Sequence, residues 1–227
     1  DNVSLNILLT ANTFDIDLSI PVSLREKFSQ PCADVVVANP PWGNPKLEDK
    51  EAREANDIGL RWCAGNDYPV GNKERSQTYI WKTIDLLRYG GTAGLLVSAG
   101  MLFNFNRSTM EFRKKFFSSV TVDYIFNFTH TRKFFFKGSN APFIAVIFNK
   151  TKAIVSKNRI HYWSAKRTAN IGSLQSVILS RNDLKFINQS DAVKEHIWKI
   201  YWWGNHQDEA LIRYLKMNDR LRDLTKP

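Results

Sequence analysis

A short apolar run that ends abruptly in Asn-Pro-Pro constrains the fold of this chain more than any other feature. Residues 34–38 read Asp-Val-Val-Val-Ala, without the alternation of apolar and polar residues that marks a half-exposed strand. This pattern predicts a strand buried on both faces, of the kind found in parallel sheets. Pro40 and Pro41 end the strand because neither has an amide hydrogen to donate to a neighbouring strand. We therefore expect an α/β fold.

The chain after this strand alternates between helical and strand patterns. Helices are predicted over residues 74–88 and 108–117, and strands over residues 93–98, 121–128 and 142–149. The connection between the last two strands is too short for a crossover helix, so these strands should pair antiparallel. The order is that of the C-terminal half of a doubly wound α/β sheet that ends in an antiparallel hairpin.

Local signals suggest where these elements begin and end. Gly90 and Gly91 are interpreted as the stop of the first helix. Ser108, followed by Glu111 three residues later, is interpreted as the N-cap of the second helix. Residues 43–73 are polar and rich in Gly, Asn and Pro. They predict a long surface loop with a helical piece over residues 48–56.

The pattern changes after residue 150. A strand is predicted over residues 159–163, and helices over residues 190–196 and 208–215. The aromatic cluster of residues 198–203 is assigned to the core of this segment. Before residue 30 the sequence predicts only the end of an apolar helix and a weak acidic segment; these cover residues 5–11 and 14–18.

Charge and composition narrow the classes of function. The 227 residues include 32 Lys and Arg against 22 Asp and Glu, a formal charge of +10, which suggests a polyanionic partner and most simply nucleic acid. No apolar run is long enough to span a bilayer, and no secretory signal is visible, so we expect no membrane association. Cys32 and Cys63 form no motif, and the four histidines show no metal-ligand spacing. We expect reduced thiols and no metal site.

The tetrapeptide Asn39-Pro40-Pro41-Trp42 suits chemistry on a nucleobase amino group. It follows a strand at its carboxyl end, where open α/β sheets hold their ligands. The lone pair of such an amino group is delocalised into the ring, and two acceptors on its N–H groups would draw the nitrogen toward a nucleophilic form. The side-chain carbonyl of Asn39 and the backbone carbonyl of Pro40 are two such acceptors. Trp42 offers a face for an extruded base. The alternative interpretation is a loop that only terminates a strand.

NPPW after a DVVVA strand resembles the catalytic motif of the amino-group DNA methyltransferases, which use S-adenosylmethionine to methylate adenine N6 or cytosine N4. The similarity continues through RYGGTAGLLVSAGMLFN, FRKKFF, VDYIFNF and FFFKGSNAPFIAVIFN. The segment WWGNHQDEALIRYLKMNDRLRDL is similar to the stretch that leads toward the DNA-specificity domain in large restriction-modification methylases. Over about residues 30–225, the resemblance implies part of a Rossmann-like methyltransferase sheet.

The resemblance also implies roles for individual residues. Asn39 and Pro40 would accept the N–H groups of the target base, and Trp42 would stack on that base after it has flipped out of the duplex. Phe136 would close the other side of the base, with Phe135 as the alternative. An Asn in the first position of the motif favours adenine over cytosine.

The loop before the last predicted strand is basic and aromatic. Arg132, Lys133 and Lys137 lie on it together with His130, a mixture that suits contact with DNA. An exposed, solvated turn is the alternative interpretation. Double-stranded DNA is the partner that the resemblance implies.

The cofactor site of the resembled family has no counterpart in this chain. A Gly-rich loop should follow the first strand of the sheet, but no such loop occurs before Asn39, and 38 residues are too few for the missing βαβ units. We expect an upstream cofactor-binding half to be absent and the chain alone to be inactive; permuted segments are the alternative. Asn39 and Pro41 are then the candidates for contacting S-adenosylmethionine.

These expectations divide the chain into two parts. Residues 1–150 would be the C-terminal half of a methyltransferase catalytic domain, and residues 151–227 an appended α+β connector toward a specificity domain. The predicted function is adenine-N6 methylation of DNA by a cytoplasmic bacterial or archaeal restriction-modification enzyme. The alternatives are methylation of cytosine N4, RNA or protein glutamine, and a non-catalytic methyltransferase-like module that binds DNA.

Overall fold

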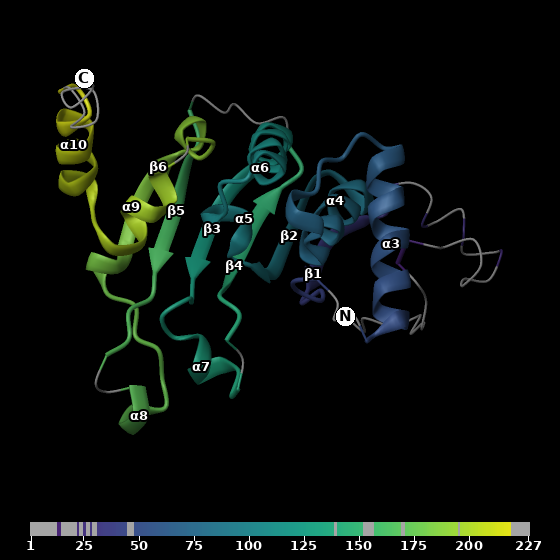
Figure 1. Ribbon diagram of the computed structural model, residues 1–227, viewed down its shortest axis with the longest axis horizontal. Helices are drawn as coiled ribbons and strands as arrows, with labels where there is room; N and C mark the ends of the chain where they lie inside the picture. Colours follow the sequence, from purple (N-terminus) through teal and green to yellow (C-terminus); the bar gives the residue numbers. More distant parts are fainter. Residues whose placement is uncertain are drawn as a thin grey trace, which may run out of the picture.

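The protein is organised around one mixed β-sheet of six strands in the order β1-β2-β4-β3-β5-β6 (Figure 1). The computed structural model describes residues 13–14, 22, 25, 28, 31–44, 48–138, 140–151, 157–168, 171–194 and 196–218. The strands are β1 (Ala33–Ala38), β2 (Leu87–Ser98), β3 (Thr121–Asn127), β4 (Phe143–Asn149), β5 (Arg159–Ser164) and β6 (Leu184–Asn188).

Four of the six strands run in the same direction. β1 pairs parallel with β2, and β3 pairs parallel with β5. β4 lies antiparallel between β2 and β3, which confirms the predicted hairpin, and β6 is antiparallel to β5. The carboxyl ends of β1, β2, β3 and β5 therefore meet at one edge of the sheet. The loops at this edge include the short helices α7 (Arg132–Phe135) and α8 (Ile171–Leu174) (Figure 1).

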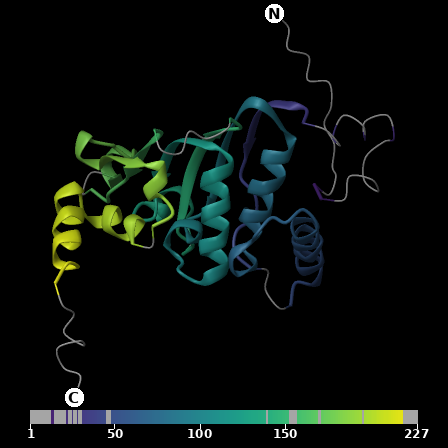
Figure 2. The same ribbon diagram turned by 90° about the horizontal axis from the view of Figure 1, so that it is seen from above.

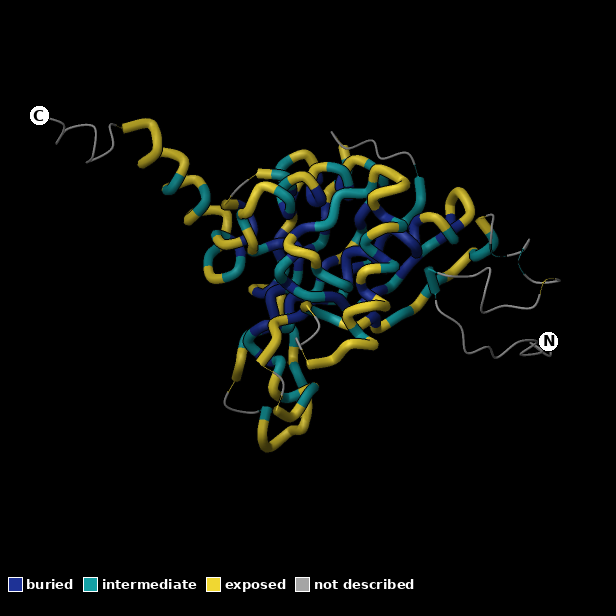
Figure 3. The backbone as a smooth tube through the Cα atoms, turned by 45° about the vertical axis from the view of Figure 1, so that its right-hand side comes forward, coloured by how far each residue is buried: buried dark blue, intermediate teal, exposed yellow. Residues whose placement is uncertain are grey.

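The helices that pack on the sheet lie on the same face of it (Figure 2). They are α4 (Arg75–Leu86), α5 (Gly100–Phe103), α6 (Arg107–Ser119) and α9 (Ile197–Trp203). Strand side chains that point toward them are fully buried, as Leu95, Val122 and Val146 show. Figure 3 shows this buried centre and the exposed helix α10 (His206–Leu215), which extends away from it.

The other face of the sheet is half-exposed. Val35 and Val37 of β1 are 67% and 81% exposed. Further along this face, Phe126 stacks with Tyr124 and Trp163 at centroid distances of 6.1 and 6.4 Å. β1 is confirmed as a strand in a parallel pair, but the prediction that it is buried on both faces is wrong. The described helices that pack on the sheet cover one face of it (Figure 2), so only one face of β1 packs on the core.

Helix α4 ends without the predicted glycine stop. It closes at Leu86, and Leu87 already has the extended backbone of β2 (φ −67°, ψ 135°). Gly90 lies inside the strand with φ 83°, a conformation that favours glycine. A Cβ atom on Gly91 would lie 3.1 Å from the carbonyl oxygens of Ala33 and Asp34. The second glycine therefore allows β1 to approach β2 closely.

Helix α6 also begins differently from the prediction. Asn106 is its N-cap, because the Asn106 side chain accepts a hydrogen bond from the Thr109 amide at 2.8 Å. Ser108 donates its hydroxyl to the same Asn106 oxygen, and Glu111 pairs with Arg107 at 3.0 Å. The capping box predicted from Ser108 and Glu111 is therefore wrong.

The helical piece predicted over residues 48–56 is confirmed as the start of α3 (Lys50–Gly65), but this helix has four turns, so the assignment of the rest of residues 43–73 to a loop is largely wrong. Asp49 caps this helix by accepting from the Ala52 amide at 2.8 Å. Gly59 and Cys63, four residues apart, share the buried face. Burial of one narrow stripe leaves most of the helix polar, and the sequence therefore resembles that of a loop.

The segment after residue 150 continues the same sheet. The strand predicted over residues 159–163 is confirmed as β5, whereas β6 was not predicted. The helix predicted over residues 190–196 is wrong, because a 3-10 turn (Gln189–Asp191) precedes α9; the helix over residues 208–215 is confirmed as part of α10.

Within the predicted aromatic cluster, Trp198 and Tyr201 are buried, but Trp203 is 70% exposed. The prediction over residues 5–11 lies outside the described residues, as does nearly all of that over residues 14–18. None of the described helices is long and apolar enough to cross a bilayer.

Candidate active site

The Asn-Pro-Pro-Trp motif begins directly after β1, at the sheet edge where the parallel strands end. Pro40 is buried, whereas Asn39 and Pro41 are exposed. Within the described part of the chain, neither the side chain of Asn39 nor the carbonyl of Pro40 has a hydrogen-bond partner. Neither predicted acceptor is therefore engaged by another described residue.

The Trp42 ring is fixed from two directions. Its indole Nε1 donates to the Leu96 carbonyl of β2 at 3.0 Å. One face stacks on Phe143, with a centroid distance of 5.2 Å and an interplanar angle of 17°. This stack uses one face of the ring, so a base would have only the remaining surface of Trp42.

Phe136 completes an aromatic cluster around Trp42. Its ring lies edge-on to Trp42 at 5.6 Å and to Phe143 at 5.2 Å. Phe135 packs on Phe128, Phe134 and Phe143, and no ring contact joins it to Trp42 among the described residues. Between the two phenylalanines considered from the sequence, Phe136 is therefore the one that the fold brings to the motif.

The backbone after the motif is held by the start of α4, a feature that the sequence reasoning missed. The carboxylate of Glu74 accepts from the Gly43 amide at 2.5 Å. The guanidinium of Arg75 donates to the carbonyls of Gly43 and Trp42 at 3.0 and 3.1 Å. These contacts fix the turn that follows Trp42. No local signal could have revealed them, because they join residues more than 30 positions apart.

A basic pocket lies between α7 and α8 at the same edge of the sheet, and no residue of the Asn39–Trp42 motif lines it. Its volume is about 550 Å³, and no Asp or Glu lines it. The lining residues are His130, Thr131, Arg132, Lys133, Phe134, Arg167, Thr168, Ile171 and Gly172. Of the three basic residues predicted to contact DNA, Arg132 and Lys133 line this pocket. Lys137 is exposed on the same loop but does not line it, and Arg167 was not predicted.

His130 faces an electropositive environment in this pocket. Burial lowers the pKa of its imidazole below the usual range, and the charges of Lys166 and Arg132 lower this pKa further. Its ring packs edge-on against Trp203 at 4.4 Å. The lowered pKa disfavours the protonated form of His130, and its buried Nε2 atom has no hydrogen-bond partner in the described part of the chain.

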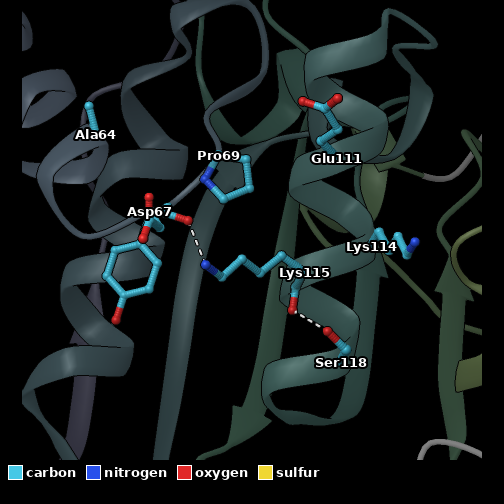
Figure 4. A pocket seen from close by; sticks show the side chains of 8 residues that line it. Ala64, Asp67, Pro69, Glu111, Lys114, Lys115 and Ser118 are labelled. Atoms are coloured by element: carbon cyan, nitrogen blue, oxygen red, sulfur yellow. Dashed lines mark hydrogen bonds between the residues drawn. The ribbon is translucent and has the colours of Figure 1, made fainter.

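A second pocket, of about 540 Å³, lies between the α3–α4 connection and α6 (Figure 4). The ammonium group of Lys115 is already engaged there, because it donates to the Asp67 carbonyl and lies 5.2 Å from the centre of the Tyr68 ring. No residue of the Asn39–Trp42 motif lines this pocket, so we do not assign it to the active site.

The fold and the site together define a methyltransferase-type α/β protein: a mixed sheet with a closing antiparallel strand and an Asn-Pro-Pro-aromatic motif at the carboxyl edge. A family model described as N-6 DNA Methylase matches residues 4–220. The chain belongs to this family. A search of curated protein sequences finds no match.

Solved structures of restriction-modification proteins resemble the chain at low identity. A type I restriction-modification system is 16% identical, with a TM-score of 0.42, over 81% of this chain and 29% of that chain. The type IIG restriction endonuclease BpuSI is 14% identical, with a TM-score of 0.49, over 79% and 21%. A putative type I modification subunit from Vibrio vulnificus YJ016 is 13% identical, with a TM-score of 0.44, over 72% and 37%. The chain thus spans less than half the length of these proteins.

Proposed function

We propose that this chain presents the target base for methyl transfer from S-adenosylmethionine to adenine N6 in double-stranded DNA. The observation that carries the proposal is the pair of free acceptors, Asn39 and Pro40, beside an aromatic surface at the carboxyl edge of a parallel pair of strands. Membership of the N-6 DNA methylase family supports it independently.

The motif residues would bind and orient the amino group. An adenine flipped out of the duplex would place its two N6 hydrogens on the Asn39 side-chain oxygen and the Pro40 carbonyl. These bonds localise the nitrogen lone pair and direct it away from the two acceptors, toward the position that the methyl group would occupy. Pro40 and Pro41 restrict the backbone, so the acceptors are held before the base arrives. When bound, S-adenosylmethionine supplies an electrophilic methyl group.

β1 forms one edge of the described sheet, and this edge would suit a cofactor that is held partly by residues outside this chain. Asn39 and Pro41 are exposed at the end of β1, and Val35 and Val37 are exposed along the same strand. This arrangement supports a partner segment beside β1, and we propose that it is a cofactor-binding half of the same parent protein. Asn39 and Pro41 would contact the cofactor from this side.

We infer that the parent is a restriction-modification methylase of a bacterial or archaeal cytoplasm. Residues 1–150 would belong to its catalytic domain, and residues 151–227 would connect this domain to a DNA-specificity domain. Arg132, Lys133 and Lys137 would contact DNA.

The complete parent protein, incubated with plasmid DNA and methyl-labelled S-adenosylmethionine, tests the reaction. Digestion of the DNA to deoxynucleosides should give label in N6-methyl-2'-deoxyadenosine and none in N4-methyl-2'-deoxycytidine. Label in cytosine would overturn the choice of base, and label only in RNA or protein would overturn the substrate. Absence of label in every fraction would favour the non-catalytic module. The isolated chain should give no turnover, and turnover by it would refute the need for a second half.

A further inference from the structure

We infer that the basic pocket between α7 and α8 binds a backbone phosphate of the DNA next to the flipped base. This inference rests on the proposed function for the identity of the DNA, but not on catalysis. The pocket combines three cationic side chains, Arg132, Lys133 and Arg167, with no carboxylate in its lining. Such a set of donors fits a phosphodiester, which is an anion with acceptor oxygens only.

The pocket lies next to the base-binding surface because both share helix α7. Phe136, directly after this helix, contacts Trp42. Arg132 and Lys133, at the start of the same helix, line the pocket. Phe136 is four positions after Arg132 and three after Lys133, so the two sites suit adjacent parts of one nucleotide chain.

The geometry of Arg132 is set before any ligand arrives. Its Nε donates to the Asn140 carbonyl at 3.1 Å, and one terminal nitrogen donates to the Thr129 carbonyl at 2.6 Å. A guanidinium has five N–H donors, so three of them remain for a phosphate. Holding the side chain in advance reduces the entropy lost on binding.

Arg167 reaches the pocket from a different strand. The amide of Ala165 donates to the Asn127 carbonyl at 3.0 Å, which ties the end of β5 to the end of β3. This bond brings the segment after β5, with the exposed Arg167, beside the loop that carries Lys133. Neither Arg167 nor Lys133 has an ion-pair partner among the described residues, so their charges are uncompensated.

The test is the salt dependence of binding between the 227-residue chain and a fluorescently labelled DNA duplex, measured by anisotropy. Each lost phosphate contact should reduce the slope of log Kobs against log salt by about 0.9. Arg167→Gln and Lys133→Gln should each show this reduction, and the double variant should show about twice as much. Lys114→Gln, an exposed lysine of α6 on the second pocket, is the matched control and should keep the wild-type slope.

Several outcomes would overturn the inference. They are an unchanged slope in Arg167→Gln, an equal loss in Lys114→Gln, no binding of duplex by the wild-type chain at low salt, and tighter binding of RNA of the same sequence. Circular dichroism of each variant checks that the fold is kept. Slope losses in a protein that methylates nothing would leave the pocket in place and refute only the proposed function; methylation with unchanged slopes would refute only the pocket.

Discussion

The loop after β1 and the loop after β3 lie at the same edge of the sheet but are built in opposite ways. The first is uncharged at Asn39–Gly43, and Glu74 and Arg75 hold its backbone from the start of α4. The second carries positive charge around a pocket, and it is held by the hydrogen bonds of Arg132 to two carbonyls and by aromatic contacts such as that of Phe136 with Trp42. Chemistry on an amino group needs fixed neutral acceptors, whereas binding of a DNA backbone needs charge. The two loops separate these tasks.

Replacement of Trp42 in the first loop should reduce methyl transfer more than replacement of Phe136 or Glu74. Trp42→Ala in the parent methylase removes the hydrogen bond to Leu96, the stack on Phe143 and the surface for the base. We expect methyl transfer to fall by about 100-fold, since base stacking alone contributes about 1–3 kcal/mol. The free energy of unfolding should also fall, by about 2 kcal/mol.

Steady-state methylation and thermal unfolding measure the two effects of Trp42→Ala. Trp203→Ala provides a matched control for unfolding, because this tryptophan is 70% exposed. Its melting temperature should stay close to that of the wild type. Equal losses of stability in the two variants would contradict the contacts described for Trp42.

A comparison of Phe135 with Phe136 tests which residue of the second loop belongs to the base-binding surface around Trp42. Both rings contact Phe143, but Phe136→Ala also removes a contact with Trp42, whereas Phe135→Ala also removes a contact with Phe128. We expect Phe136→Ala to lower kcat/KM for DNA by about 10-fold, within the range for one aromatic contact with a base. Phe135→Ala should change it less. A larger loss of kcat/KM in Phe135→Ala than in Phe136→Ala would assign the contact with the base to Phe135 instead.

A smaller effect is expected for the support behind the motif. Glu74→Gln weakens the bond to the Gly43 amide and keeps the size of the side chain. We expect the rate of methyl transfer to fall by about 5-fold with DNA affinity unchanged, because loss of a charge-assisted hydrogen bond costs about 1 kcal/mol. Glu111→Gln, on the surface of α6, is the control. A loss of DNA affinity in Glu74→Gln without a loss of rate would show that the two loops are not separate.

The smallest effect is a dependence of DNA affinity on pH. Burial and the neighbouring charges of Lys166 and Arg132 lower the pKa of His130, so it gains its proton only below the usual value of about 6.5. A bound phosphate would raise this pKa, so the complex binds more protons than the free chain, and affinity should rise as pH falls. The wild-type chain should gain about 2-fold in DNA affinity between about pH 7.5 and 5.5, and His130→Asn should not show this gain. If DNA affinity depends on pH identically in the variant and the wild type, protonation of His130 does not contribute to the positive charge of the pocket.

The same lowered pKa affects stability with the opposite sign. The unfolded chain binds a proton at His130 more readily than the folded chain, so this residue reduces stability as pH falls below about 6.5. DNA should therefore protect the protein more against thermal unfolding at the acidic end of the range than at neutral pH.

Local patterns predicted the elements whose signals are contained in a few residues. The run of valines before Asn39 predicted a strand in a parallel pair and the motif at its end. Residues 121–149 predicted two antiparallel strands because the connection between them is short. The positions of Asn39 and Trp42 at the candidate site followed from the first strand, whereas Phe136 was named because of the resemblance to the methyltransferase family.

Features that depend on distant contacts could not be predicted in the same way. Glu74 supports Gly43 across 31 positions, and Arg167 joins the basic pocket only because β5 pairs with β3. The glycine pair after α4 looked like a helix stop, because its role depends on the approach of β1. The exposure of Val35 could not be predicted, because residues 35–38 are all apolar and show no alternation that would mark one face as exposed.

The most direct test of the division between the loops compares Asn39→Ala with Arg167→Gln in single-turnover methylation by the parent protein over a range of DNA concentrations. At saturating DNA, Asn39→Ala should remain about 100-fold or more below the wild-type rate, since loss of one polar contact to the reacting group costs about that much, and its DNA affinity should be unchanged. Arg167→Gln should reach the wild-type rate once DNA is saturating. Recovery of Asn39→Ala at high DNA concentration, or a persistent rate defect in Arg167→Gln, would contradict this account.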